Sequence, residues 1–266
     1  MSFVLYLFLV HLGVGISLAL LLVSKEAGLK FFRFSAGVAA LLLATAMAFR
    51  PPTDVIGDTV IGAASITMLG IALATLTIYW LIAGRVLSQL RPVLAVVATV
   101  AGFIAITLHS LVAATPAVSG GLLTAISALT AVTLLGCTCT AMVLGHWYLV
   151  IPSMDIRHLQ RIVFLHIITL GARIVIVAIA LIVALSEPLL TGQSLQQYVV
   201  SIDGIFLWQR ILFGLAVPMV LAYLTWETAK IRSTQSATGI LYVDFFTVMV
   251  GEVLSGYLWL STGLAV

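Results

Sequence analysis

Long apolar segments recur along almost the whole chain and constrain its fold more than any other feature. A membrane-spanning helix needs about 20 predominantly apolar residues. Eight segments approach or exceed that length: Phe3–Ser24, Phe34–Phe49, Thr59–Ile82, Pro92–Ala114, Gly121–Val150, Gln160–Ser186, Gly204–Lys230 and Ala237–Leu264. The sequence therefore predicts an all-α polytopic integral membrane protein, a bundle of about eight transmembrane helices.

The composition agrees with a chain solvated mainly by lipid. Charged residues make up 8% of the sequence, whereas soluble domains carry about 25%. The formal net charge of +3 is too small to indicate nucleic-acid binding. No loop is long enough to form a domain, so we expect one transmembrane helical domain over residues 1–266. The longest loop, Glu187–Asp203, is expected to form a short interfacial helix.

Basic residues differ sharply between the two sides of the predicted bundle. The loops after the first, third, fifth and seventh helices hold nine of them: Lys25, Lys30, Arg33, Arg85, Arg91, Arg157, Arg161, Lys230 and Arg232. Arg50 is the single basic residue in the loops of the other side. Because cytoplasmic loops carry an excess of Lys and Arg, both termini are predicted on the outer, periplasmic side of a bacterial inner membrane.

Polar residues inside the predicted helices fall into layers, because a helix rises about 1.5 Å per residue. An outer layer holds His11, His109 and Arg210, and an inner layer holds His146, His166, Glu227 and Asp244. Arg173 and Glu252 lie near mid-depth. Ionisable side chains in hydrocarbon are costly and usually face the bundle interior, so these nine residues are candidates for function.

Arg173 and Glu252 are predicted to form an ion pair, since each lies at mid-depth on a different helix. One interpretation is a bridge that only specifies the fold. The other is a proton or quinone-linked relay in which Glu252 titrates, with Arg173 and Asp244 as further catalytic candidates.

The four histidines within the membrane suggest b-type haem, which takes one imidazole from each of two helices at the same depth. The outer pair would be His11 with His109, and the inner pair His146 with His166. Arg210 is a further candidate for cofactor binding in the outer layer. Two such haems would carry electrons across the membrane.

Other interpretations need no haem. A single buried histidine in a membrane is usually a hydrogen-bonded packing residue, which is the alternative for His11 and His109, while His146 beside Trp147 and Tyr148 equally suits an interfacial aromatic belt. His146, His166, Asp244 and Glu227 together suit a quinone headgroup, which needs hydrogen-bond donors and a proton route. A secondary transporter is a further alternative, although Pro218 is the one clear internal proline and has no counterpart in the first half. The last alternative is a purely structural membrane anchor.

The sequence thus predicts a membrane subunit of a respiratory or photosynthetic electron-transfer complex that exchanges electrons with quinone. It has no ATP-binding loop, zinc-ligand spacing or dinucleotide-binding turn, so the chain would be a non-catalytic or quinone-reactive subunit. Soluble redox chemistry would come from a cytochrome c, iron–sulfur or molybdenum subunit, and membrane lipid would surround the bundle.

Overall fold

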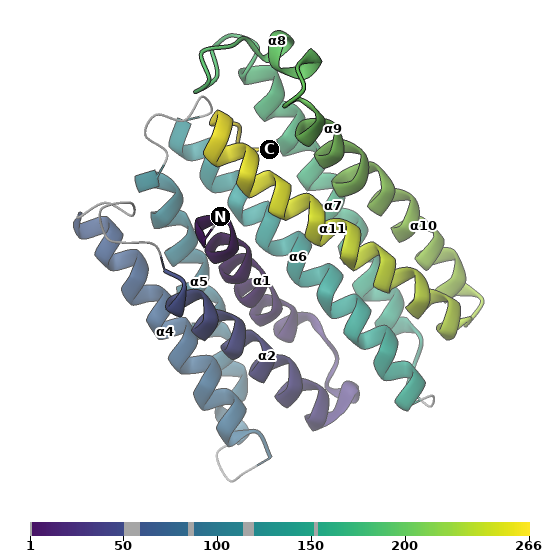
Figure 1. Ribbon diagram of the computed structural model, residues 1–266. Helices are drawn as coiled ribbons and strands as arrows, with labels where there is room; N and C mark the ends of the chain where they lie inside the picture. Colours follow the sequence, from purple (N-terminus) through teal and green to yellow (C-terminus); the bar gives the residue numbers. More distant parts are fainter. Residues whose placement is uncertain (1, 51–58, 85–87, 114–119, 152–153) are drawn as a thin grey trace.

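The computed structural model describes residues 2–50, 59–84, 88–113, 120–151 and 154–266, which are helical and contain no strand (Figure 1). The long helices are α1 (Ser2–Leu22), α2 (Gly28–Ala48), α4 (Val60–Ile82), α5 (Arg91–Ala113), α6 (Gly120–Val150), α7 (Arg157–Val183), α10 (Val217–Lys230) and α11 (Thr234–Thr262). The 3-10 turns η1 (Lys25–Ala27) and η2 (Ser88–Leu90) precede α2 and α5, and α9 (Ile205–Ile211) runs through the π-helix η3 (Leu212–Ala216) into α10.

Within the described residues, eight helices are long and apolar enough to span a membrane when α9, η3 and α10 are taken as one. This confirms the all-α fold with eight candidate spans and is compatible with a multi-pass membrane protein. Arg85 and most of the loop around residues 115–121 lie outside the described residues.

Helix α2 begins earlier than predicted, at Gly28 instead of Phe34. Lys30 and Arg33 therefore lie in its first turns, where both side chains are exposed and the Arg33 guanidinium lies 5.7 Å from the centre of the Trp80 ring. Long basic side chains extend their charge toward water while their stems cover apolar surface, so they do not have to lie in a loop.

The segment predicted to form a short helix does so as α8 (Leu195–Val200). A capping box begins it: the Ser194 hydroxyl accepts from the Gln197 backbone N–H, and the Gln197 side chain accepts from the Ser194 N–H.

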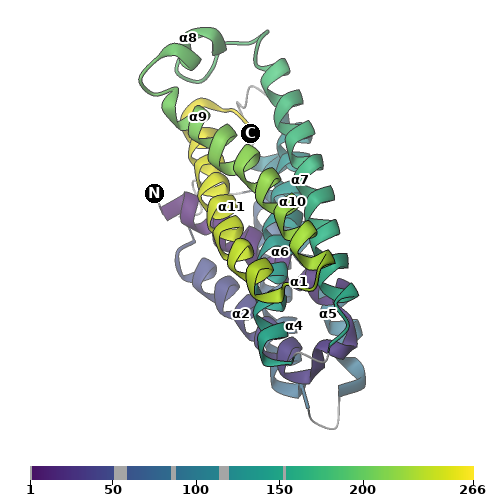
Figure 2. The same ribbon diagram turned by 90° about the vertical axis from the view of Figure 1, so that its right-hand side faces the viewer.

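The end of the molecule opposite α8 is called the basic end here. It consists of residues 23–30, 83–84, 88–91, 154–157 and 230–234. Both chain termini lie toward the end that carries α8, opposite the basic end (Figures 1 and 2).

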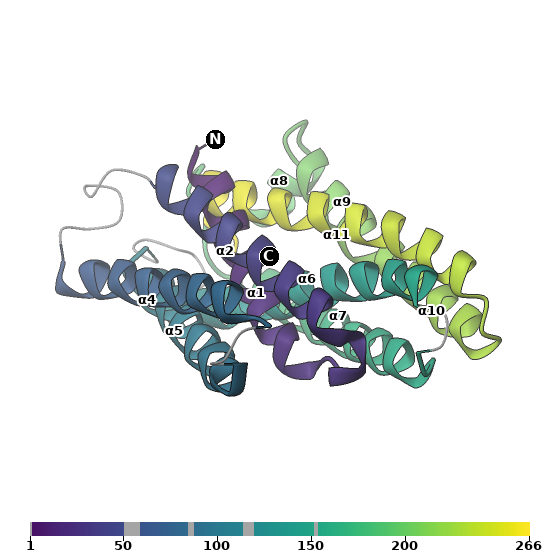
Figure 3. The same ribbon diagram turned by 90° about the horizontal axis from the view of Figure 1, so that it is seen from below.

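The eight long helices form two rings of four. Helices α1, α2, α4 and α5 pack in sequence and close on one another, and we call them the first bundle. Helices α6, α7, α10 and α11 do the same and form the second bundle. Contacts of α1 with α6 and α11, and of α5 with α6, join the two. Figure 3 shows α1 and α6 in the middle, with α4 and α5 on one side and α10 and α11 on the other.

The two bundles touch backbone to backbone where α1 crosses α6. A Cβ atom on Gly15 would overlap the carbonyl oxygen of Val132 and the backbone of Gly136, and a Cβ on Gly136 would overlap the carbonyl of Gly15. Small residues let helices in membranes approach this closely. These two glycines therefore set the distance between the bundles.

We predict that Gly15→Ala destabilises the protein, because the new methyl group meets rigid backbone. Overpacking of this kind typically costs about 1–3 kcal/mol, and each kcal/mol lowers the unfolding midpoint by about 2–4 °C in a chain of this size. Thermal unfolding of the purified protein in detergent measures the change. Gly70→Ala is the matched control, since nothing lies within 4 Å of a Cβ built there. Equal midpoints for the two variants would contradict the prediction.

Candidate functional site

The predicted ion pair between Arg173 on α7 and Glu252 on α11 is present and fully enclosed. Arg173 donates from Nε to Oε1 at 3.1 Å and from Nη2 to Oε2 at 2.9 Å, a two-pronged contact between planar groups. Both side chains are almost completely buried. Bidentate pairs of guanidinium and carboxylate are among the strongest charge-assisted hydrogen bonds, so this contact holds α7 and α11 at a fixed height.

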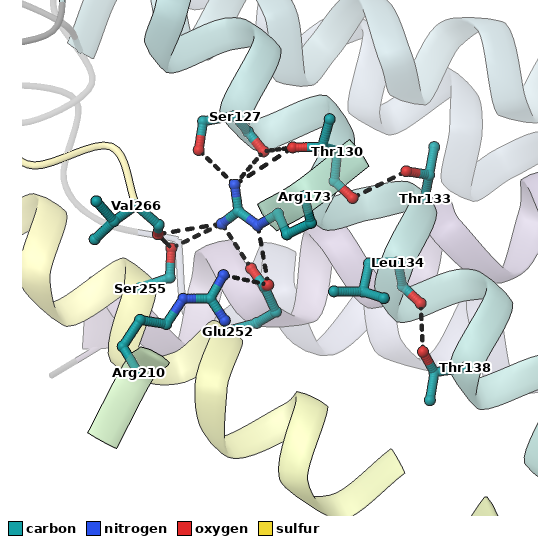
Figure 4. Close-up of polar contacts among 10 residues, drawn as sticks. All are labelled: Ser127, Thr130, Thr133, Leu134, Thr138, Arg173, Arg210, Glu252, Ser255 and Val266. Atoms are coloured by element: carbon teal, nitrogen blue, oxygen red, sulfur yellow. Dashed lines mark hydrogen bonds and ion pairs between the residues drawn. The ribbon is translucent and has the colours of Figure 1, made fainter. Parts of the chain in front are cut away.

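The remaining Arg173 donors are also occupied (Figure 4). Nη1 donates to the hydroxyl and the carbonyl of Ser127 on α6, at 2.6 and 3.0 Å, and lies 3.4 Å from the Thr130 hydroxyl. Nη2 donates to the Ser255 hydroxyl at 3.0 Å and to the Val266 backbone oxygen at 3.2 Å. The guanidinium thus connects α6, α7 and α11 in one network.

Arg210, at the end of α9, makes a contact that the sequence did not predict. It was expected in the outer layer with the histidines, but its Nη2 donates to Glu252 Oε1 at 2.8 Å. We call Arg173, Arg210 and Glu252 the charge cluster. With two cations and one anion, its formal charge is +1. Arg210 is fully buried, and its Nε and Nη1 have no hydrogen-bond partner among the described residues.

The local backbone makes room for Arg210. A Cβ atom on Gly214 or Gly251 would lie 2.7 or 2.8 Å from its Nη1. Gly214 belongs to η3, the π-helix that directly precedes Pro218. A proline inside a helix usually kinks it, and the wider turn has the same physical origin, because Pro218 has no N–H for the carbonyl one turn earlier.

A second buried ionic contact lies nearer the basic end. The Nε2 atom of His166 on α7 lies 2.8 Å from Oδ2 of Asp244 on α11, and both side chains have zero exposure. This is ion-pair distance without hydrogen-bond geometry, and neither Asp244 oxygen accepts a hydrogen bond from a described group. We call these residues the His166–Asp244 pair.

Hydrogen bonding constrains the proton in this pair. The Thr138 hydroxyl on α6 donates to the Leu134 carbonyl at 2.7 Å, so its single hydrogen is used there. His166 Nδ1, 2.9 Å from the same oxygen, must then be the donor. The other ring nitrogen, Nε2, then faces the Asp244 carboxyl group and is the second position at which the imidazole can carry a proton.

The charge cluster and the His166–Asp244 pair use the same three helices. Helix α6 supplies Ser127 and Thr138, α7 supplies Arg173 and His166, and α11 supplies Glu252 and Asp244. The two members on α7 are seven residues apart and those on α11 are eight apart, which corresponds to roughly 10–12 Å along a helix axis. The second bundle therefore holds two polar levels in one core.

A cavity of about 60 Å³ lies between the two bundles, and we call it the interbundle cavity. His11 on α1 and His109 on α5 line it from the first bundle, and Arg173, Glu252 and Ser127 line it from the second. His109 is 7% exposed, and its Nε2 has no hydrogen-bond partner among the described residues. The expected outer-layer histidines thus meet the mid-depth charges at one site.

The expected inner pocket of four residues does not form. His146 is exposed, and its Nδ1 lies 3.2 Å from the Tyr242 hydroxyl. Glu227 pairs instead with Lys230 at 2.6 Å and is partly exposed. Of these four residues, His166 and Asp244 are the two that lie in contact. Depth was estimated from sequence position, but the rotation of each helix about its axis decides which side chains face one another.

The residues as placed do not fit haem b. Both His166 nitrogens face Thr138 or Asp244, and His146 has a separate environment. His11 and His109 share the interbundle cavity, but about 60 Å³ is far below the roughly 300–1,000 Å³ of sites for sizeable ligands. Among the described residues, no group of three or more His, Cys, Asp or Glu side chains suits a metal ion.

Comparisons with protein-family models, with curated proteins and with solved structures found no match for this chain. The geometry of its own residues is therefore the basis for assigning a function.

Sequence reasoning missed the hydroxyl groups that complete both polar levels, which are those of Ser127, Thr138 and Ser255. Ser127 and Thr138 are eleven residues apart on α6, which is three helical turns and puts them on one face. That spacing is a usable signal. Ser and Thr are, however, frequent in apolar helices, where many bond only to the preceding turn, as Thr67 and Thr75 do here.

We predict that Glu252→Gln destabilises the protein much more than Arg210→Met. The first change leaves two buried guanidinium groups without a counter-charge, and removing one partner of a buried pair costs about 3–5 kcal/mol. The second removes the excess cation and keeps the Arg173 pair. Thermal unfolding in detergent measures both, with an expected drop of about 6 °C or more for Glu252→Gln. An unchanged midpoint for Glu252→Gln would instead indicate that Glu252 is neutral in the folded protein.

Proposed function

We propose that this chain is a haem-free, quinone-reactive membrane subunit of an electron-transfer complex, with the quinone headgroup in the interbundle cavity. The observation that carries the proposal is the meeting of His11 and His109 with the Arg173–Glu252 ion pair around one cavity. Of the two redox alternatives that the sequence left open, the haem-free one agrees better with the partners of His166 and with the size of the cavity.

The cavity lining supplies what a quinone headgroup needs. Its two carbonyl oxygens need hydrogen-bond donors, and a buried donor without a partner is costly unless a ligand uses it. His109 Nε2 is a buried nitrogen without a hydrogen-bond partner among the described residues on the side of the first bundle, and it is a donor in the tautomer that carries the proton there. Across the cavity, the charge cluster carries a formal charge of +1. That charge favours the anionic forms through which a quinone passes during reduction.

The cavity must widen to admit a quinone ring. Phe8 and Trp259 line it and are only partly buried. Side chains in such positions change rotamer more readily than a packed core, so we propose that the ring enters by displacing them. The surrounding α1, α5, α6 and α11 then keep their places.

The His166–Asp244 pair is the proposed proton source. Reduction of a quinone to a quinol consumes two protons, and a His–carboxylate contact that holds one transferable proton suits their delivery. The pair lies between the interbundle cavity and the basic end, on the same helices as the charge cluster. We propose that protons enter from the basic end and pass through Asp244 toward the cavity.

The distribution of basic residues supports an orientation. Apart from the buried Arg173 and Arg210, the described Lys and Arg residues lie at or next to the basic end, with the exception of Arg50. By the positive-inside rule this end faces the cytoplasm. We propose a bacterial inner-membrane subunit with both termini in the periplasm. The described residues hold no extramembrane domain, so a partner subunit with a cytochrome c, iron–sulfur or molybdenum centre would exchange the electrons.

Quinone binding to the purified protein tests the proposal. Short-chain benzoquinone and naphthoquinone, titrated into the protein in nanodiscs, are expected to quench tryptophan fluorescence saturably, and Trp259→Phe should remove most of that quenching. His109→Leu should weaken binding about tenfold, since one lost hydrogen bond to a buried group costs about 1–3 kcal/mol. His146→Leu is the matched control, because His146 lies outside the cavity.

Quenching that does not saturate, or equal affinities for the two histidine variants, would contradict the proposed site. The absorption spectrum of the same natively purified protein tests the rejected alternative. A Soret band at one haem per chain, lost in His109→Leu, would overturn the haem-free form and support haem ligation by the outer histidines.

We predict that Asp244→Asn slows quinone-driven oxidation of the partner's reduced redox centre in the natively purified complex by about 100-fold, the lower range for loss of a general acid or base. Quinone affinity should stay unchanged, since Asp244 does not line the cavity. Asp244→Glu, which restores a carboxyl group, should recover part of the rate. Thr225→Val is the control, because Thr225 is buried but bonds only within its own helix. A wild-type rate in Asp244→Asn would exclude this proton route.

A further inference from the structure

Residues 263–266 follow α11 without forming a helix, and we call them the return segment. Gly263 ends α11 in a left-handed backbone conformation (φ 78°), which lets the chain leave the helix axis and turn back. Leu264 and Val266 are almost completely buried, and Ala265 lines the interbundle cavity. The return segment therefore forms part of the wall of that cavity.

The backbone oxygen of Val266 is held by two donors beside the cavity (Figure 4). The Ser255 hydroxyl donates to this oxygen, and Arg173 Nη2 donates to it at 3.2 Å. Nη2 carries two hydrogens, but it lies within hydrogen-bond distance of three acceptors. The other two are Glu252 Oε2 at 2.9 Å and the Ser255 hydroxyl at 3.0 Å. The contact with Val266 is the longest of the three, so Arg173 can release it most easily.

A quinone in the interbundle cavity needs the same donors. His109 Nε2 suits one of its two carbonyl oxygens, and the other oxygen must find donors on the side of the second bundle. Arg173 and Ser255 line the cavity there, but their donors are already occupied. A quinone oxygen resembles a backbone carbonyl oxygen, since each has two lone pairs and accepts two hydrogen bonds. The Val266 oxygen thus occupies the position that suits the second quinone carbonyl.

We propose that the return segment is autoinhibitory, and that a quinone carbonyl displaces the Val266 oxygen from Ser255 and Arg173. This inference rests on the proposed function and adds to it the second pair of donors and the group that competes for them. Buried donors without an acceptor are costly. In this scheme the return segment satisfies them when no quinone is bound, and the quinone satisfies them afterwards.

Few hydrogen bonds oppose the displacement. No described residue accepts from the backbone N–H of Ala265 or Val266. The Gly263 N–H donates to the Trp259 carbonyl at 3.0 Å, and the Leu264 N–H donates to the Thr262 hydroxyl at 3.3 Å. Both of these bonds lie at the start of the return segment. The last two residues can therefore leave the wall while the end of α11 stays in place.

Deletion of residues 264–266 removes the competing oxygen. A short-chain, tetrasubstituted benzoquinone titrated into the protein in nanodiscs should then bind about tenfold more tightly, which is about 1.4 kcal/mol and corresponds to an open fraction of about one in ten in the full chain. Leu264→Ala weakens the apolar anchor of the return segment and should change affinity in the same direction by a smaller factor. Leu159→Ala is the matched control, because Leu159 is similarly buried but lies on α7 near the basic end, outside the cavity.

Ser255→Ala distinguishes competition for a donor from a general loosening of the bundles. In the deletion variant the hydroxyl serves only the quinone, so its loss should weaken binding about tenfold. In the full chain the same change also weakens the competing contact with Val266, and quinone affinity should fall by a smaller factor. Equal effects of Ser255→Ala in the two backgrounds would overturn the proposal.

Thiol labelling in the full chain follows the return segment directly. Ala265→Cys is introduced into a chain in which the buried Cys137 and Cys139 are replaced by Ala. A membrane-impermeant maleimide should react slowly at this position, because residue 265 is 4% exposed, and several-fold faster once the benzoquinone is bound. A tetrasubstituted ring has no free position for addition of the thiol.

The outcomes separate the two proposals. Saturable quinone binding with the same affinity in the full chain and the deletion variant would overturn the autoinhibitory role and leave the quinone site in place, as would a labelling rate that quinone does not change. If neither form binds quinone saturably, the quinone site is wrong and the autoinhibitory role fails with it.

Discussion

The neutralisation of charge away from water is the constraint on which the second bundle depends. An isolated ionised group at mid-depth in a membrane costs at least about 2.5–3.5 kcal/mol, and Arg173, Arg210 and Glu252 are all almost fully buried. Glu252 reduces the cost for both cations, and α6 contributes the Ser127 oxygens. Since hydrogen bonds require definite distances and angles, this network sets the register of three helices more strictly than apolar contacts do.

The first bundle is held by different means. Its core consists of small and aliphatic side chains together with aromatic rings such as those of Phe31 and Tyr79, and one of its buried polar contacts joins Ser17 and Thr99 at 3.2 Å. Apolar contacts tolerate small shifts in register, whereas a guanidinium–carboxylate contact does not.

The fold was largely predictable, because apolar length alone determines the number of spanning helices. Depth along each helix was predictable too, and it paired Arg173 with Glu252 correctly. Rotation about each helix axis was not predictable, since it depends on packing between helices that local sequence does not encode. For this reason the contact of Arg210 with Glu252 was not predicted, and His146 was expected beside His166 although its side chain is exposed. The roles of these residues in redox chemistry remain predictions that the structure does not test.

The closure of each ring within one half of the chain has a consequence for biogenesis. Chains leave the ribosome N-terminus first, and units that complete early fold early. Helices α1, α2, α4 and α5 are complete before α6 is made, so His11 and His109 belong to the ring that can form first. Arg173 and Glu252 belong to the second bundle, which is complete only after α11 has been synthesised. The interbundle cavity therefore forms only after the helices of both rings have been synthesised, which makes it a late product of folding.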